Sequence, residues 1–87
     1  MNLQETEFLR DLGFRIRERR TERNLTQADL AERCGLHRTF IGSVERGERN
    51  LSVLNLRLIA MALRVPPAEL LADDTGGRRG RTARPDR

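Results

Sequence analysis

The chain has 87 residues, of which 37% are hydrophobic, 34% are charged and 3% are aromatic. A chain of this length can form one small domain, and this composition is typical of a helical domain that folds in water. The sequence has no run of about 18 apolar residues, so we expect no membrane span, and its start, Met1-Asn2-Leu3-Gln4-Glu5, does not resemble a signal peptide. A single cysteine excludes an internal disulfide and suits the reducing cytoplasm, where we expect the protein to reside.

The formal net charge of +4 is concentrated at the carboxyl end of the chain. All 17 basic residues are arginines. Residues 1–75 hold twelve arginines and twelve acidic residues, whereas residues 76–87 hold five arginines and one aspartate. The net charge is therefore no argument that the folded part binds nucleic acid. Such an argument needs arginines that share one face.

Two helices are expected in the first third of the chain. Apolar residues such as Leu12 and Ile16 recur at helical spacing and predict a helix over residues 6–23. Thr26 is a residue of the type that caps a helix start, and it precedes a second helix over residues 27–33.

Three more helices follow. The third is expected over residues 38–46 and ends at Gly47. Ser52 caps a fourth over residues 53–63, and a pair of prolines opens a short fifth over residues 68–72. No alternation of apolar and polar residues is long enough for a strand, so the expected fold is all-α with five helices.

Residues 73–87 form a separate segment of glycine, arginine, threonine and proline without large apolar side chains. Such a segment cannot bury enough surface to offset its ordering entropy. We therefore divide the chain into a domain, residues 1–72, and a disordered tail, residues 73–87. The tail could lie along DNA phosphates or serve only solubility.

The residues around the second and third helices match a known family. Two short helices joined by a turn that contains Gly35 form the helix-turn-helix pattern. Over residues 9–71 the chain closely resembles the lambda-repressor-like, or XRE, family of DNA-binding domains. The features that carry this resemblance are, in order, Ile16-Arg17, Arg20, Leu25-Thr26-Gln27, Leu30-Ala31, Glu45-Arg46-Gly47, Ser52 and Ala62-Leu63-Arg64-Val65. Within the family, Arg49-Asn50-Leu51-Ser52 and Leu56-Arg57-Leu58-Ile59 look most like controller proteins of restriction–modification systems.

The resemblance implies a compact five-helix domain whose third helix enters the major groove of DNA. The outward residues expected to contact bases are Arg38, Thr39, Ser43 and Arg46. An arginine can donate two hydrogen bonds to guanine, which makes Arg38 the main candidate. The alternative is that Arg38 is only a solvated residue at the start of a helix.

A second set of residues is expected to contact phosphates and to position the helix without reading sequence. These residues are Arg23, Gln27, His37, Phe40, Arg49 and Asn50. Three of them have alternatives: Arg23 could be a solubilising residue at a helix end, His37 could cap the third helix, and Phe40 could cover the core.

Two further expectations concern helix packing. The resemblance implies that Arg20 and Glu45 form a partly buried ion pair between the first and third helices. The fourth helix has more apolar residues than one face needs: its expected inward residues are Val53, Leu56, Ile59, Ala60 and Leu63. The surplus predicts a homodimer interface. Its expected residues are Leu54, Leu58, Met61, Leu70 and Leu71. The alternative is that these residues pack within one chain.

Catalysis and metal binding are not expected. Cys34 and His37 make a single C-x-x-H pair, whereas a zinc site needs three or four ligands, so Cys34 is expected to fill core space. With one cysteine and one histidine no catalytic constellation can be assembled. We therefore expect no enzyme activity, no cofactor, no metal and no small-molecule ligand.

These observations together predict a homodimeric transcription regulator that binds a palindromic operator in double-stranded DNA. It would repress when the site overlaps a promoter and activate when it touches RNA polymerase beside one, and it would autoregulate as controller proteins do. One alternative is an antitoxin of similar fold. The other is a helical adaptor that binds only protein, against which the expected common face of Gln27, Arg38 and Arg49 argues.

Overall fold

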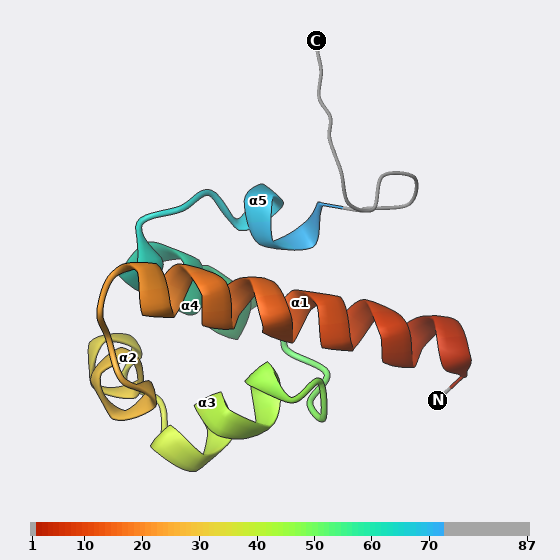
Figure 1. Cartoon of the computed structure of the whole chain (residues 1–87), viewed down its shortest axis with the longest axis horizontal. Helices are drawn as coiled ribbons and strands as arrows, with labels where there is room; N and C mark the ends of the chain where they lie inside the picture. Colours follow the sequence, from red (N-terminus) through yellow and green to blue (C-terminus); the bar gives the residue numbers. More distant parts are fainter. Residues whose placement is uncertain (1, 73–87) are drawn as a thin grey trace, which may run out of the picture.

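The computed structural model describes residues 2–72 and contains five helices (Figure 1). They are α1 (Leu3–Glu22), α2 (Gln27–Cys34), α3 (Arg38–Glu45), α4 (Val53–Leu63) and α5 (Pro67–Leu71). The described residues include no strand, which confirms the all-α prediction. The predicted disordered tail, residues 73–87, lies outside the described residues.

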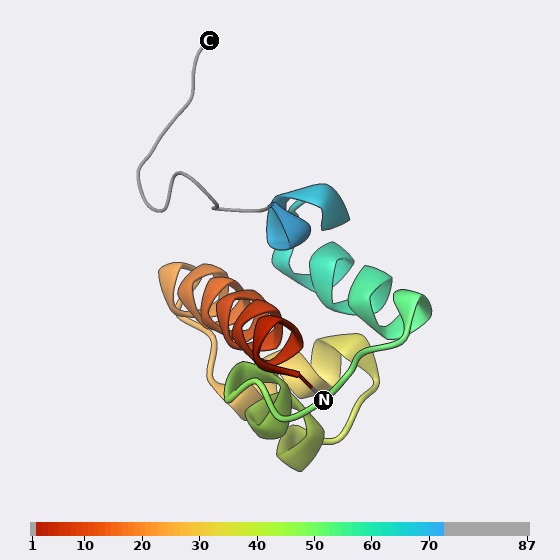
Figure 2. The same cartoon turned by 90° about the vertical axis from the view of Figure 1, so that its right-hand side faces the viewer.

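The long helix α1 is the element around which the others are arranged. Helices α2 and α3 lie on one side of it, and α4 and α5 lie on another (Figures 1 and 2). Helix α1 packs against α3, α4 and α5, while α2 packs against α3 and α4. None of the helices in residues 2–72 is both long and apolar enough to cross a membrane.

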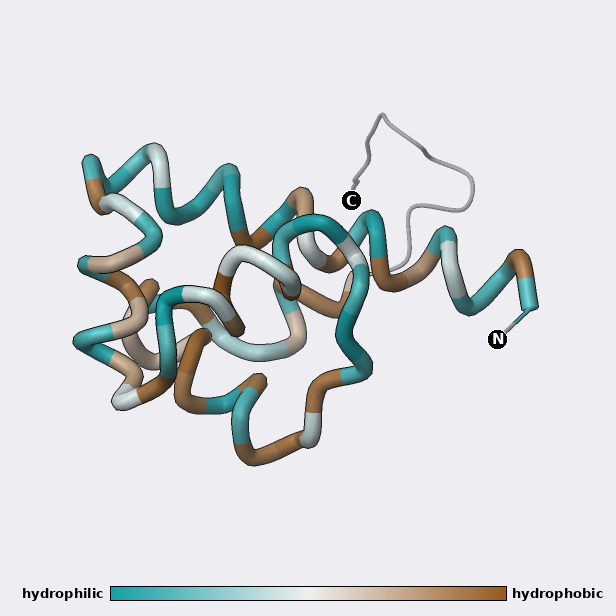
Figure 3. The backbone as a smooth tube through the Cα atoms, turned by 90° about the horizontal axis from the view of Figure 1, so that it is seen from below, coloured by the Kyte–Doolittle hydropathy of each residue, from teal (hydrophilic) through white to brown (hydrophobic). Residues whose placement is uncertain are grey.

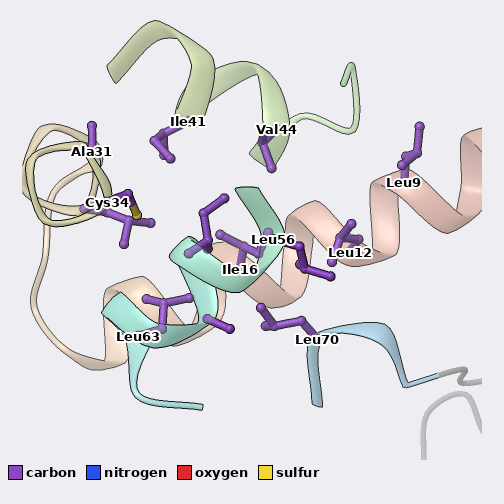
Figure 4. Close-up of a cluster of buried hydrophobic side chains, with 13 residues drawn as sticks. Leu9, Leu12, Ile16, Ala31, Cys34, Ile41, Val44, Leu56, Leu63 and Leu70 are labelled. Carbon is purple, nitrogen blue, oxygen red and sulfur yellow. The ribbon is translucent and has the colours of Figure 1, made fainter. Parts of the chain in front are cut away.

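All five helices contribute to one hydrophobic core (Figure 4). Apolar and hydrophilic residues alternate along α1 (Figure 3). The face that carries Leu9, Leu12 and Ile16 is buried. The largest fully buried side chains are Ile16, Leu30, Ile41, Val44, Ile59, Leu63 and Leu70. Cys34 is also buried, as predicted, and its Sγ lies 3.8 Å from the carbonyl oxygen of Leu58.

The start of α1 differs from the prediction. Asn2 is the N-cap: its Oδ1 accepts from the N–H of Glu5 at 2.8 Å, and the Glu5 side chain accepts from the N–H of Asn2 at 3.3 Å. This capping box starts the helix at Leu3, three residues before the predicted start. The apolar pattern gave no sign of it, because the first turn of α1 extends beyond the core.

Four helices end in the same way. Each of the helices α1 to α4 is followed by a residue with a left-handed backbone conformation. These residues, with their φ values, are Asn24 (59°), Gly35 (73°), Gly47 (78°) and Arg64 (61°). In each case the next N–H donates to a carbonyl five residues earlier, as in Glu48 to Ser43 at 2.9 Å. Arg64 is the one non-Gly, non-Asn residue of the four, and an arginine gives no sequence signal for such a turn.

One predicted core residue proves to be on the surface. Val53 was expected on the inward face of α4, but it is 84% exposed. It is the first residue of the helix, where its side chain lies beyond the end of the core. Leu56, Ile59, Ala60 and Leu63 are buried as predicted.

Candidate nucleic-acid interface

Helix α3 is held against α1 by a close contact between two backbones. A Cβ atom at Gly13 would overlap the carbonyl oxygen of Val44 and would lie 2.6 Å from that of Glu45. Only glycine therefore allows the end of α3 to approach α1 this closely. The prediction missed the role of Gly13; the available signal was a glycine inside a strongly helical stretch.

A buried polar network also fixes α3. Arg20 Nε donates to Glu45 Oε2 at 2.6 Å, and Arg20 Nη1 donates to the carbonyl oxygen of Leu25 at 2.8 Å. Gln27 Nε2 donates to Glu45 Oε1 at 3.0 Å. The hydrogen bonds that Arg20 donates to Glu45, and the negative charge of Glu45, raise the pKa of Arg20 above its ordinary value. The predicted ion pair is confirmed, and it connects α1, α2 and α3.

Three of the four predicted base-contacting residues lie exposed on or next to α3. Arg38 and Thr39 occupy its first turn, and Arg46 is its C-cap. Arg46 Nε donates to Glu48 at 3.1 Å, and this hydrogen bond raises the pKa of Arg46. These side chains are accessible to a ligand on the side of α3 that the core does not cover.

Ser43 does not belong to that accessible set. Ser43 is only 7% exposed, and its Oγ–H donates to the carbonyl oxygen of Phe40 at 2.8 Å. The same Oγ accepts from Arg49 Nε at 3.2 Å. The helix face that holds Ser43 is covered by the segment after α3, which the helical pattern alone did not reveal. The expectation that Ser43 faces outward is therefore wrong.

The residues predicted to contact phosphates have different surroundings. Arg23, Arg49 and Asn50 are exposed, whereas Gln27 is half-buried and uses its amide nitrogen on Glu45. His37 caps α3, because its Nδ1 accepts from the N–H of Thr39 at 3.1 Å.

Phe40 is half-buried and packs against the core. The guanidinium carbon of Arg49 lies 5.5 Å from the centre of its ring. The alternative in which Phe40 covers the core thus agrees with its position. Phosphate contact by this whole set of residues stays a prediction.

The predicted dimer interface divides into exposed and buried members. Leu54 is 65% exposed, Met61 is 60% exposed and Leu71 is 41% exposed. Leu58 is partly buried and packs against the core. Leu70 is fully buried within its own chain, between α5 and the rest of the core, so its assignment to a dimer interface is wrong. Adjacent residues of a helix point in different directions, and only Leu71 faces outward.

Helices α2 and α3 pack against each other and are joined by a short turn, which is the helix-turn-helix arrangement. A helix-turn-helix family profile matches residues 16–70. The chain belongs to the helix-turn-helix family. The matched residues begin in α1 and end in α5, so the match covers more than the two helices that give the family its name.

The helix-turn-helix relatives include control proteins. The control protein C.BamHI of Bacillus amyloliquefaciens is 44% identical over 66 residues, which are 75% of this chain and 82% of that protein. The crystal structure of the restriction–modification controller protein C.AhdI of Aeromonas hydrophila has 47% identity and a TM-score of 0.70, covering 71% of this chain and 94% of that one. The tetramer of controller protein C.Esp1396I bound to its natural 35 base-pair operator has 38% identity and a TM-score of 0.67, covering 72% and 83%.

The family and these relatives make the chain a helix-turn-helix transcription regulator that resembles restriction–modification controllers. The predicted resemblance is thereby confirmed. Within residues 2–72 no group of three or more His, Cys, Asp or Glu side chains is arranged to hold a metal ion.

Proposed function

We propose that this helix-turn-helix regulator binds a palindromic operator as a homodimer, with α3 of each copy in the major groove. The observation that carries the proposal is the exposed set Arg38, Thr39 and Arg46 on a helix whose opposite side is fixed to α1 and α2. The controller protein C.Esp1396I, of similar fold, is bound to operator DNA as a tetramer.

Each exposed residue has a distinct role in this proposal. Arg38, at the start of α3, donates two hydrogen bonds to a guanine edge, and Thr39 contacts a neighbouring base. Arg46 releases its hydrogen bond to Glu48 and contacts a base instead. The residues that contact phosphates are Arg23, Gln27, Arg49 and Asn50. The open N–H groups at the start of α2 assist there, because the end of a helix that exposes them favours an anion.

The second copy is expected to dock on the exposed apolar residues Leu54, Met61 and Leu71. A two-fold dimer places its two recognition helices about 34 Å apart, one turn of DNA, and so requires half-sites in palindromic arrangement. In this proposal the protein acts in the cytoplasm by binding DNA, and it catalyses no reaction. It represses where the operator overlaps a promoter, and it activates where it contacts RNA polymerase.

Selection of bound duplexes from a random DNA library, at about 150 mM salt to suppress phosphate-only binding, tests the proposal. We expect enrichment of a palindrome with half-sites about one turn apart. Arg38→Ala should weaken the selected site about 10-fold or more and non-specific DNA much less. Arg33→Ala is the matched control, because it also removes an exposed arginine, near the end of α2, that is not among the proposed DNA contacts. Failure to enrich any sequence would contradict the proposal, and an equal loss on all sequences would make Arg38 a phosphate contact.

A further inference from the structure

We propose that Ser43 and Phe40 are positioning residues that hold the Arg49 guanidinium ready for a DNA phosphate. This inference rests on the proposed function. It gives the buried Ser43 a role other than the predicted direct contact with a base.

The turn after α3 brings Arg49 back beside the helix. Gly47 has a φ of 78°, a left-handed conformation that favours glycine. The N–H of Glu48 donates to the carbonyl oxygen of Ser43 at 2.9 Å. The chain therefore reverses direction directly after α3, and Arg49 lies over the helix turn that contains Phe40 and Ser43.

Two contacts of different kinds restrict the Arg49 guanidinium. Its Nε donates to Ser43 Oγ at 3.2 Å, and its Cζ lies 5.5 Å from the centre of the Phe40 ring. A hydrogen bond and a ring contact on the same planar group together limit its rotation. Among residues 2–72, Nη1 and Nη2 of Arg49 have no hydrogen-bond partner, so the end of the guanidinium is available to a ligand.

The Ser43 hydroxyl is already committed within the protein. It donates its hydrogen to the carbonyl oxygen of Phe40 at 2.8 Å and accepts from Arg49. A buried hydroxyl with both functions used has little to offer a base, but it orients the arginine that it binds. Ser43 therefore acts through Arg49.

A phosphate is the ligand that suits this arrangement. Two Nη groups at the end of a fixed guanidinium match two phosphate oxygens. Arginine side chains normally lose much rotamer freedom when they bind, and a guanidinium that is already held loses less. Arg49 lies in the segment after α3, beside the exposed Asn50, where a phosphate that flanks the groove would be reached.

A double-mutant cycle on the selected operator tests the role of Ser43. We expect Ser43→Ala to weaken binding about three- to tenfold, the effect of one hydrogen bond. We expect Arg49→Ala to weaken it more, and the double variant to bind like Arg49→Ala alone. Ser43→Thr, which retains the hydroxyl, should restore most of the affinity. If Ser43→Ala has the same effect with and without Arg49, the proposal is overturned.

The salt dependence identifies the ligand of Arg49. Loss of one phosphate contact should lower the slope of log K against log salt by about one, equally on specific and non-specific DNA. A loss confined to one base position would instead assign Arg49 to a base and overturn the phosphate assignment.

A measurement without DNA separates this inference from the proposed function. In the free protein, the NMR resonance of the Arg49 Nε–H should show slower hydrogen exchange in the wild type than in Ser43→Ala. Equal exchange in the two would refute the positioning role even if the operator is bound. Failure of the wild type to bind any DNA would instead refute the proposed function.

Discussion

Glu45 accepts two hydrogen bonds from one guanidinium: Arg20 Nε lies 2.6 Å from its Oε2 and Arg20 Nη2 lies 3.0 Å from its Oε1. The two side chains are 11% and 3% exposed. Because they belong to α1 and α3, the pair connects α1 to the helix that is proposed to enter the major groove. Its loss should therefore affect both the free energy of unfolding and the placement of α3.

Glu45→Ala should lower the free energy of unfolding by about 3–5 kcal/mol, because the Arg20 charge stays buried without its partner. The double variant Arg20→Met, Glu45→Leu should lose less than Glu45→Ala, since apolar side chains of similar size need no partner. Urea unfolding followed by circular dichroism measures both. If the double variant loses the sum of what Arg20→Met and Glu45→Leu lose as single variants, the two charges are not coupled.

Glutamate at the proposed dimer interface should give folded monomers. Leu54→Glu or Met61→Glu places a charge on a highly exposed residue of α4 and should leave the free energy of unfolding of the monomer nearly unchanged. Either change should raise the monomer–dimer dissociation constant by about 10-fold or more, because the charge loses water on association. Analytical ultracentrifugation measures it.

Leu3→Glu is the control for the interface, since Leu3 is an equally exposed leucine at the start of α1. Unchanged dimerisation in both α4 variants would place the interface elsewhere. Leu58→Glu is a poorer test, because Leu58 packs against the core and its replacement would also destabilise the fold.

Acid should weaken the start of α2. The backbone N–H of Thr26 donates to Asp29 Oδ2 at 2.9 Å, and Thr26 Oγ1 accepts from the backbone N–H of Asp29 at 3.0 Å. Hydrogen bonding by the Thr26 backbone, and then by its side chain, holds the pKa of Asp29 below its ordinary value. A group with a lowered folded-state pKa contributes stability above its unfolded pKa, about 3.9, that is lost as pH falls through the folded value. The free energy of unfolding should therefore decrease less in Asp29→Asn than in the wild type when the pH is lowered from about 5 to about 2.5, a range that spans this unfolded-state pKa. Parallel curves would show that Asp29 does not contribute.

Replacement of Arg64, the left-handed residue at the end of α4, should stabilise the protein. Arg64 has a φ of 61°, which costs energy for any residue with a Cβ atom. Arg64→Gly should raise the free energy of unfolding by up to about 1 kcal/mol. Arg17→Gly, at an exposed interior position of α1, should lower it by about 1 kcal/mol. Thermal unfolding of both variants checks the contrast, and a loss in Arg64→Gly would show that the arginine side chain has a stabilising contact.

The helix bounds that could be read from the sequence were those with local signals. Thr26 and Ser52 accept from the N–H three residues on, and Gly35 and Gly47 end the two central helices, so α2 to α4 are close to their predicted bounds. These signals depend only on a few neighbouring residues. The start of α1 was missed because its cap precedes the apolar pattern.

The sequence predicted which residues surround the candidate site better than it predicted which way their side chains face. Family resemblance placed Arg20 with Glu45, and that pair forms. The burial of Ser43 and Leu70 could not be predicted in the same way, because it depends on how the next segment and the neighbouring helices pack. A helical period identifies a face, but tertiary contacts decide which face is covered.

The contact at Gly13 holds α3 at the end opposite to Arg38 and Thr39, two of the residues that are proposed to contact bases. Its anchoring groups are the carbonyl oxygens of Val44 and Glu45 and the Glu45 side chain, all at the end of the helix that faces α1. Arg38 and Thr39 take no part in this anchoring. Exchanges at these two positions should therefore leave the docked helix in place. In the proposed DNA complex, they would change which operator is bound while the scaffold stays the same.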